Sequence, residues 1–576
     1  YIDMVSLIPT DGYGYGNKNY SYGAGLRKDL VEKLQQLKPG FIRFPGGCVV
    51  EGSYGSDGYY NWEDSVGPLE QRRAIGSYWG SPWKSVNYGT GQDNYGYMMS
   101  YQFGYHEILT LCEDLGAQAF PILSAGIFCQ FTESSSASVS GEQLKPFADH
   151  ATHLIDYCWG DPDSSDATQA SWAKKRVQNG HEKPFDLNYL GIGNENWEQP
   201  EKNISYYANF KWIKDYVETY VKEHYPNRKI TLISSTGPYY QGGQNTSAWN
   251  WANSEMPGET LVDEHYYINY TGDGDNTLLN SDYIYDNYKR LNEGGSNVFV
   301  GEYAGHLTTT KENVLDTAIS EAAYMTGLER NGDIVRHASY APLFEREGCR
   351  DWDYNLIKFN AFESYGTPSY YVQTMYSNNY GKHIIDTTLE EYNDDTSVFD
   401  KKPGHQTDLY YVTSEDDYDL YTKLVNHADY SKEITLNYPG IKDGSQVELI
   451  CLSGNAMDMN TMENQTRVAP VTTKKTLNGG QMTYEAPAMS LTVVKVNHTK
   501  KPEEKPVETT VDKKALNASI ATAKTKKQID YTSATWKKFK TALTAAQNIA
   551  KNAKATQTQV NTAKKNLDTA ARGLVK

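Results

Sequence analysis

The chain has 576 residues, of which 39% are hydrophobic and 13% aromatic. This length fits three or four domains, and this share of apolar side chains excludes wholesale disorder. The formal net charge of −17 argues against a nucleic acid or an anionic membrane as the main partner, because both bind a cationic surface. No apolar run reaches the length of about 18 residues that a transmembrane helix needs, so none is predicted.

The charges are divided unevenly along the chain. Residues 500–576 contain 17 Lys and Arg against 6 Asp and Glu, a net charge of +11. Residues 1–499 therefore contain 38 basic and 66 acidic side chains, a net charge of −28. The two parts differ in chemistry, so the exclusion of nucleic acid applies to the first part, and we expect the second to be a separate module.

Eight short apolar runs recur through the first part of the chain, at 2–9, 41–44, 118–124, 187–193, 230–235, 261–267, 298–302 and 335–343. Stretches with helical spacing of apolar residues lie between several of them, at 26–37, 206–225 and 313–330. Eight strands that alternate with helices predict an α/β fold, a (β/α)8 or TIM barrel, over residues 1–366. No Gly-x-Gly-x-x-Gly follows the early strands, which argues against a nucleotide-binding fold.

The pattern changes after residue 366. Short alternating segments separated by Gly, Asp and Asn follow, at 408–413, 419–426, 432–436, 446–452, 481–485 and 490–496, and they predict an antiparallel β-sandwich over 367–497. Residues 498–510 form a linker rich in Pro and charge. The tail, 511–576, is rich in Ala, Lys and Thr with apolar residues at helical spacing, and it predicts a small three-helix bundle.

The six cysteines, at positions 48, 112, 129, 158, 349 and 451, lie far apart. They form neither a Cys-x-x-Cys pair nor a cluster with histidine, so the spacing typical of metal ligands is absent. We interpret them as scattered core thiols and predict no metal site.

Two acidic residues end predicted strands, which is where the functional groups of a (β/α)8 barrel gather. Glu195 follows Asn194 at the end of the fourth run, and Glu302 ends the seventh. A carboxyl group that emerges from a buried strand must be paired or used in chemistry. Two carboxyl groups across one barrel mouth suit glycoside hydrolysis, in which one is the general acid and the other the nucleophile or base.

Six segments carry a resemblance to a known family: 41–52, 60–68, 190–197, 263–267, 299–304 and 338–344. Together they resemble family 51 of the glycoside hydrolases, the α-L-arabinofuranosidases, over roughly residues 1–497. The resemblance implies a retaining enzyme without a cofactor that releases terminal α-L-arabinofuranosyl residues from plant glycans such as arabinoxylan and arabinan. The tail resembles the helical "found in various architectures" modules of secreted bacterial glycan-degrading proteins.

The resemblance also implies roles for individual residues. Glu195 is similar to the acid/base of the family and Glu302 to its nucleophile, with carboxyl groups expected about 5–5.5 Å apart. Asn194 would hold the 2-hydroxyl of the sugar. His265 and Tyr267 match a His-x-Tyr pattern in which the tyrosine hydroxyl hydrogen-bonds the nucleophile.

Further substrate-side residues follow from the same resemblance. Arg43 would stabilise the nucleophile by its charge, and Trp62, Trp83 and Trp197 are candidates to stack on sugar faces. Cys48 stands where many members have Asn after Pro-Gly-Gly, so one substrate contact is expected to differ.

Other positions depart from the family. The acidic residue that many members carry after the first strand has no clear counterpart between Ser6 and Asn17, and strand eight offers Tyr340, Pro342 and Leu343 in place of a polar contact. We therefore expect a furanoside pocket of different shape. Members with similar barrels have a β-rich region before the first strand, so we expect this chain to start late.

Three alternatives remain open at this stage. The same chemistry serves a β-xylosidase or an endo-acting glucanase or xylanase, and a barrel without activity would be a carbohydrate-binding surface protein. The basic tail is either a solvated helical face or a surface that binds cell wall or another glycan. Linker and tail predict a secreted or cell-surface bacterial protein.

Overall fold

The computed structural model describes residues 7–52, 59–76, 98–129, 138–238, 242–256, 260–267, 281–287, 295–307, 312–348, 354–390, 408–498, 512–552 and 557–575, and in addition residues 258, 278, 279, 310, 352, 405, 406 and 555. Contacts divide the chain into two compact units, 1–499 and 500–576. Each unit is described by itself below.

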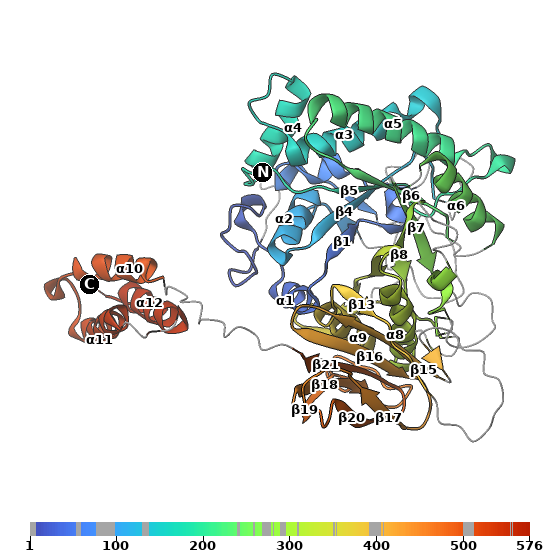
Figure 1. Ribbon diagram of the computed structural model, residues 1–576. Helices are drawn as coiled ribbons and strands as arrows, with labels where there is room; N and C mark the ends of the chain where they lie inside the picture. The colour runs from blue at the N-terminus through green and yellow to red at the C-terminus, as the bar shows by residue number, and fades with distance from the viewer. Residues whose placement is uncertain are drawn as a thin grey trace. The chain divides into compact units, whose positions relative to one another are not determined.

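Seven described strands of the first unit form one parallel sheet in chain order, which is the arrangement of a (β/α)8 barrel (Figure 1): β1 (Phe41–Phe44), β4 (Gln118–Leu123), β5 (Tyr189–Ile192), β6 (Thr231–Ser235), β7 (Leu261–Tyr266), β8 (Asn297–Tyr303) and β9 (Val335–Tyr340). Seven of the eight predicted apolar runs are thus confirmed as strands. Of the remaining run, 2–9, residues 7–9 are irregular and the rest lies outside the described residues.

The helices alternate with these strands: α1 (Lys28–Leu37), α2 (Tyr105–Leu115), α3 (Lys145–Trp159), α4 (Ala167–Gln178), α5 (Tyr206–His224), α6 (Gly243–Glu255), α8 (Leu315–Arg330) and α9 (Pro368–Asn378). The three helices predicted from spacing are confirmed to within two residues. Helices α3, α4 and α5 lie side by side on the outside of the sheet (Figure 1). Short 3-10 turns complete the unit, at Ser21–Gly23, Gly47–Val50, Trp62–Ser65, Leu69–Gln71, Gly141–Leu144, Pro200–Lys202 and Ile284–Asn287.

Aromatic rings fill the barrel interior near the start of its strands. Phe120 stacks on Tyr189 with ring centroids 4.2 Å apart, and Phe41, Phe299 and His337 pack around them. These side chains come from five strands, and the first four pack with the buried Ile233 and Leu261. The described part of the barrel is therefore a packed core at this end, which leaves the C-terminal ends of the strands for chemistry.

Two small sheets stand beside the barrel: β2 (Ala74–Gly76) with β3 (Met98–Ser100), and β10 (Phe344–Arg346) with β11 (Ile357–Phe359) and β12 (Ser364–Gly366). The predicted sandwich follows, and all its pairings are antiparallel. Its larger sheet has the order β13 (His383–Ile385), β15 (Leu409–Glu415), β16 (Asp419–Asn426), β21 (Ser490–Asn497), β18 (Gln446–Ser453), β19 (Val471–Thr476), with β14 (His405–Gln406) beside β15. The smaller sheet pairs β17 (Lys432–Asn437) with β20 (Gln481–Ala486).

Barrel and sandwich share a hydrophobic core. Helix α8 packs on β15 and β16, and its Leu315 and Ile319 lie in one buried cluster with Val425 and Leu491. Helix α9 follows the predicted boundary at residue 366 and packs on α1 and α8 as well as on β18 of the sandwich. The shared core explains why residues 1–499 form one compact unit.

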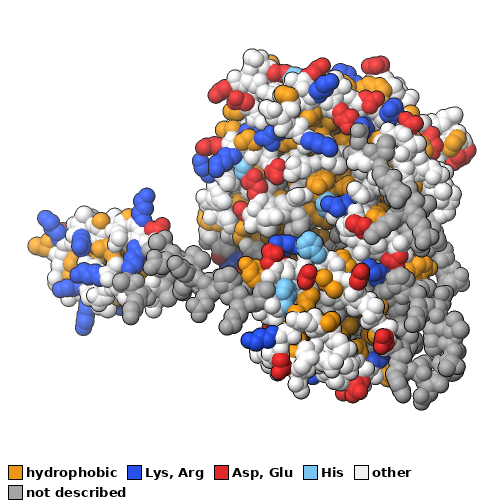
Figure 2. Space-filling model, in the orientation of Figure 1, with side chains coloured by type: hydrophobic (Ala, Val, Ile, Leu, Met, Phe, Trp, Pro, Cys, Tyr) orange, Lys and Arg blue, Asp and Glu red, His pale blue; other side chains and the backbone are white. Residues whose placement is uncertain are grey.

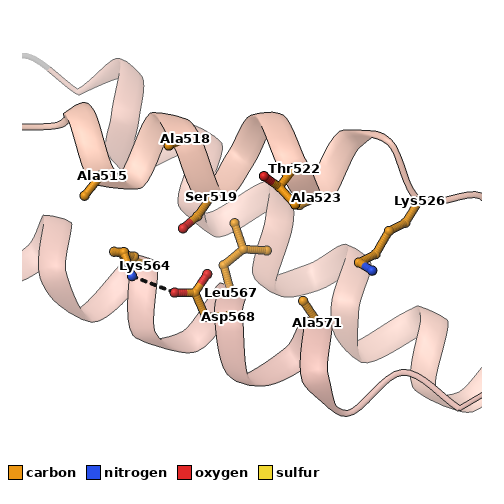
Figure 3. A pocket seen from close by; sticks show the side chains of 10 residues that line it. All are labelled: Ala515, Ala518, Ser519, Thr522, Ala523, Lys526, Lys564, Leu567, Asp568 and Ala571. Carbon is orange, nitrogen blue, oxygen red and sulfur yellow. Dashed lines mark hydrogen bonds and ion pairs between the residues drawn. The ribbon is translucent and has the colours of Figure 1, made fainter.

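The second unit contains three helices, as predicted: α10 (Lys514–Lys524), α11 (Ser533–Lys551) and α12 (Gln557–Arg572), with a 3-10 turn at Gln528–Asp530. Predicted apolar positions form its core, including Leu516, Phe539, Val560 and Leu567. Basic side chains outnumber acidic ones on the face in Figure 2. A groove of about 370 Å³ lies between α10 and α12, where Lys564 pairs with Asp568 at 2.7 Å (Figure 3).

Among the described residues, no helix combines the length and the apolar character needed to cross a bilayer.

Helix α8 carries a buried carboxyl group that contacts the chain just after β8, the strand that contains Glu302. Glu321 is fully buried, and its Oε1 accepts a hydrogen bond of 2.9 Å from the backbone N–H of Gly305, which follows β8. Burial raises the pKa of Glu321 to about 8. The folded protein therefore holds this proton at pH values at which an unfolded chain has released it.

This proton makes stability depend on pH. Between about pH 4.5 and pH 8 the folded state binds one proton more than the unfolded chain at Glu321, so the free energy of unfolding falls as pH rises. Glu321→Gln removes this dependence. We therefore expect the melting temperature of the variant, relative to that of the wild type, to increase from pH 5 to pH 8.5. The exposed Glu142→Gln is the control. A constant difference between Glu321→Gln and wild type across this range contradicts the assignment.

Candidate active site

The C-terminal ends of β1, β5, β7 and β8 bring four charged side chains together. Arg43 comes from β1, Glu195 from the turn after β5, His265 from β7 and Glu302 from β8. One carboxylate oxygen of Glu195, one of Glu302 and a ring nitrogen of His265 lie within 4.8 Å of one another. The carboxyl groups of Glu195 and Glu302 thus lie in one cluster, and the sequence had predicted that they face each other.

Glu302 owes its inward direction to an irregularity in β8. Val300 pairs with Glu264 on β7, but Glu302 pairs with His265, so Gly301 is an extra residue in β8. A bulge of this kind redirects the side chain that follows it. Gly301 has to be glycine, because a Cβ there would lie 2.1 Å from Oδ1 of Asp263.

The surroundings of Glu302 favour its ionised form. Its Oε1 accepts a hydrogen bond of 2.8 Å from Arg43, and its Oε2 lies 3.1 Å from the Tyr267 hydroxyl and 3.6 Å from Nδ1 of His265. Burial alone would raise the pKa of this carboxyl group, but the charges of His265 and Arg43 outweigh burial and lower it. A buried carboxylate with these donors fits a nucleophile.

His265 lies between the two carboxyl groups. Its Nδ1 donates to Oε1 of Glu195 at 2.8 Å, and its Nε2 donates to Oδ2 of Asp263 at 3.3 Å. Burial opposes a charge on the ring, but the carboxylates of Glu302 and Asp263 prevail and raise the pKa of His265 to about 10. The imidazole is therefore a cation at neutral pH.

The same charge bears on metal binding. Glu195, His265 and Glu302 are spaced as metal ligands can be. A protonated imidazole has no lone pair to offer, however, and Arg43 already pairs with Glu302. This donor set suits a proton-transfer site better than a cation site.

Asp263 is a site residue that the sequence analysis did not single out. Its carboxylate accepts hydrogen bonds from the backbone N–H of Gly301 at 2.9 Å and from His265, and it lies 3.5 Å from Arg43. Alternation along β7 was the available signal, because Asp263 is two residues before His265 and shares its face.

Asn194 presents a free donor. Its Oδ1 accepts from Arg43 at 2.7 Å and from the backbone N–H of Gly47 at 3.1 Å. Its Nδ2 is buried without a hydrogen-bond partner among the described residues. A fixed amide with an unused N–H fits the predicted contact to a sugar hydroxyl.

The turn that carries Glu195 has an unusual backbone. Glu195 has a φ of +50°, in the left-handed region that side chains rarely adopt, and Gly193 has a φ of +89°. The hydroxyl of Tyr206 joins this turn to β6, since it donates to the carbonyl of Ile192 and accepts from the N–H of Ser235, both at 2.8 Å. Local strain of this kind persists only where the surroundings enforce it.

The structure corrects one predicted substrate contact. Trp62 is 0% exposed, its indole donates to the carbonyl of His150, and it packs against Trp172, so no ring face is open to a sugar. Trp197 is half-buried beside Gly237, and Trp83 lies outside the described residues. Cys48 is buried with its thiol in hydrogen-bond contact with that of Cys129.

Residues after β9 contact Tyr267 in a way that the sequence did not indicate. The Tyr267 hydroxyl lies 3.2 Å from the carbonyl oxygen of Ala341, the residue after β9, so the backbone makes a contact where a polar side chain was sought. The ring of Trp352 meets that of Tyr267 edge-on with centroids 5.1 Å apart. Trp352 lies in an irregular segment, where no periodicity draws attention to it.

Family models agree with this geometry. Residues 33–290 match the α-L-arabinofuranosidase 1 domain, and residues 301–490 match the α-L-arabinofuranosidase C-terminal domain. Among solved structures, an arabinose-bound GH51 α-L-arabinofuranosidase is 25% identical with a TM-score of 0.65, over 84% of this chain and 68% of that one. The chain belongs to glycoside hydrolase family 51. The resemblance predicted from the motifs is confirmed, and residues 512–575 match a FIVAR domain.

Curated members of this family differ from the chain in length. It is 36% identical over 399 residues to an extracellular exo-α-L-arabinofuranosidase of Streptomyces chartreusis, which covers 67% of this chain and 41% of that protein. It is 30% identical over 474 residues to α-L-arabinofuranosidase 2 of Arabidopsis thaliana, covering 82% and 59%. The chain thus spans about half the length of these two relatives.

The charge on His265 can be observed directly. We expect its ring to titrate near pH 10, and in Glu302→Gln at a lower pH, because the variant removes the largest favourable charge. NMR of histidine-labelled protein measures this, with His265→Gln to identify the signal. His306 is the internal reference, because burial lowers its pKa to about 4. A His265 ring that titrates near pH 6.5 contradicts the arrangement.

Proposed function

We propose that the chain is a retaining α-L-arabinofuranosidase with Glu302 as nucleophile and Glu195 as acid/base. The observation that carries the proposal is the pair of carboxyl groups, with oxygens within 4.8 Å, beside two buried cations. Retaining glycosidases hold their carboxyl groups about 5–5.5 Å apart, and inverting enzymes hold theirs at about 6.5–9.5 Å to admit a water.

The reaction follows in two steps. An oxygen of Glu302 bonds to the anomeric carbon as the glycosidic bond breaks, and Glu195 gives its proton to the leaving oxygen. Glu195 then takes a proton from water, which attacks the anomeric carbon and releases Glu302 and the free sugar. The free N–H of Asn194 holds a sugar hydroxyl as positive charge develops on the ring.

His265 serves both steps through its position. In the free enzyme the anion is Glu302, and after the first step it is Glu195, because Glu302 has become an ester. Nδ1 of His265 lies 3.6 Å from Oε2 of Glu302 and 2.8 Å from Oε1 of Glu195. One cation therefore stabilises whichever carboxylate is charged.

Family membership supports arabinofuranosides over xylosides or glucans as substrates, and a polymeric arabinose-containing plant glycan as their source. The extracellular relative and the FIVAR match support a secreted or cell-surface bacterial location. The basic FIVAR unit would then hold the enzyme to cell wall or to another glycan. The half-buried Trp197 and the thiol of Cys48 remain proposed sugar contacts.

Activity on a panel of aryl glycosides tests this function. We expect turnover of the α-L-arabinofuranoside and a loss of about 10⁴-fold or more in Glu302→Ala, since the nucleophile is gone. Azide should restore turnover in that variant and give an arabinosyl azide of inverted configuration. NMR of the product determines that configuration. Glu321→Gln is the control. Wild-type preference for a xyloside or a glucoside, or full activity of Glu302→Ala, contradicts the proposal.

The ionised state of the proposed nucleophile depends on Arg43. Two adjacent glycines allow this dependence to be tested, because substitution of only one of them displaces the arginine. Gly46 and Gly47 have φ values of +65° and +66°, but a Cβ on Gly46 would lie 2.4 Å from a guanidinium nitrogen of Arg43, whereas one on Gly47 meets nothing within 4 Å. Both alanine variants carry similar backbone strain, and only Gly46→Ala displaces the arginine.

We expect Gly46→Ala to lose about tenfold or more in kcat/KM relative to Gly47→Ala. The acidic limb of the pH–rate profile of Gly46→Ala should move to higher pH, because Arg43 is one of the charges that lower the pKa of Glu302. Rates from pH 4 to 8 measure both effects. Equal activity and equal acidic limbs in the two variants would show that Arg43 does not hold Glu302 ionised.

A further inference from the structure

A second buried carboxyl group lies under the turn that carries Glu195. Glu51 follows the 3-10 turn after β1 and is 0% exposed. Its Oε1 accepts a hydrogen bond from Nδ2 of Asn196, and the backbone amide of Asn194 also acts on its carboxyl group. Glu51 thus contacts the residues on both sides of Glu195.

The amide of Asn196 is itself confined. A Cβ on Gly193 would lie 2.4 Å from Oδ1 of Asn196, so this side chain fills the space beneath the turn. The turn holds Glu195 at a φ of +50°, a conformation that needs support from its surroundings. The contact between Asn196 and Glu51 joins the turn to the loop after β1. The same loop contains Gly47, whose backbone N–H donates a hydrogen bond to Asn194.

The protonation state of Glu51 follows from what surrounds it. Its Oε2 has no hydrogen bond and the group has no ion pair within the described part of the chain. Burial, then the nearby Cys129 thiol and Glu195, raise the pKa of Glu51 well above its usual value, and the thiol of Cys48 faces the same cluster. Glu51 is therefore a neutral acid at neutral pH.

Glu264 shows the contrasting case in the same unit. It is equally buried, but it accepts hydrogen bonds from Asn245, Trp249, Tyr266 and Tyr285, at 2.9, 2.6, 3.0 and 2.7 Å. Both of its carboxyl oxygens therefore have hydrogen-bond donors. Glu51 has no comparable set, so its site is built for the uncharged form.

We propose that Glu51 is a positioning residue for the acid/base: a neutral buried carboxyl group that holds the Gly193–Asn196 turn and thereby directs Glu195 at the leaving oxygen. It places no negative charge of its own beside Glu195. This role rests on the proposed function.

Two substrates distinguish this role from a general loss of structure. The dinitrophenolate of a dinitrophenyl α-L-arabinofuranoside is a good leaving group and departs without protonation. The alcohol of a benzyl α-L-arabinofuranoside is a poor leaving group and needs a proton from Glu195. We expect Glu51→Ala to lower kcat/KM about 100-fold on the benzyl substrate but less than about fivefold on the dinitrophenyl substrate, since general acid catalysis contributes about 10²–10⁴-fold. Glu51→Asp, which retracts the carboxyl group from Asn196, should show the same pattern and decides the question if Glu51→Ala does not fold.

Glu51→Gln tests the neutral form. An amide has the same shape and no charge, so we expect rates within about threefold of wild type on both substrates and an unchanged alkaline limb of the pH profile. An alkaline limb that moves to lower pH in Glu51→Gln would show that Glu51 is an anion in the wild type and overturn its neutral role. Glu321→Gln, another buried carboxyl group with a raised pKa, is the matched control.

Equal losses on the two substrates in Glu51→Ala or Glu51→Asp, or no loss on either, overturn the positioning role. A wild type that turns over neither arabinofuranoside contradicts the proposed function instead. The two failures are therefore separable.

Discussion

Two buried cations among three carboxyl groups are the interaction on which the site depends. Arg43 and His265 lie between Asp263, Glu302 and Glu195, with N···O distances from 2.8 to 3.6 Å. Taking charges out of water is costly, and only close, complementary pairing offsets that cost. A cluster of this kind tolerates little displacement of any member, so the strands that carry them must hold a fixed register.

The fold meets that demand on both faces of β7. Asp263 and His265 point into the barrel, and between them Glu264 is anchored in the outer layer by hydrogen bonds from α6 and neighbouring tyrosines. The strand is thus fixed from behind by one carboxylate and from the front by another. The bulge at Gly301 then brings Glu302 to the same mouth.

Patterns of burial made most of the fold predictable. The parallel strands are continuous apolar runs because helices cover them, and Glu195 and Glu302 could be found because each interrupts such a run at its end. Strand β19 escaped prediction because all of its residues are exposed, so it has no alternation to detect. Trp62 was misjudged because sequence does not distinguish a tryptophan in a core from one at a rim. Asp263 could have been found from its alternation with His265 along β7, whereas Glu51 contacts Asn196, which is distant in sequence, and no local pattern reveals such a contact.

The aromatic rings that fill the barrel at the start of its strands bear on how molecules reach and leave the site. Phe41, Phe120, Tyr189 and Phe299 pack together at the start of the strands, so among the described residues the barrel is filled at the end opposite the site. Under the proposed mechanism, the departing alcohol and the arriving water both pass on the side of the C-terminal strand ends. On that proposal the first product leaves before the water that replaces it reaches the ester proposed to form on Glu302.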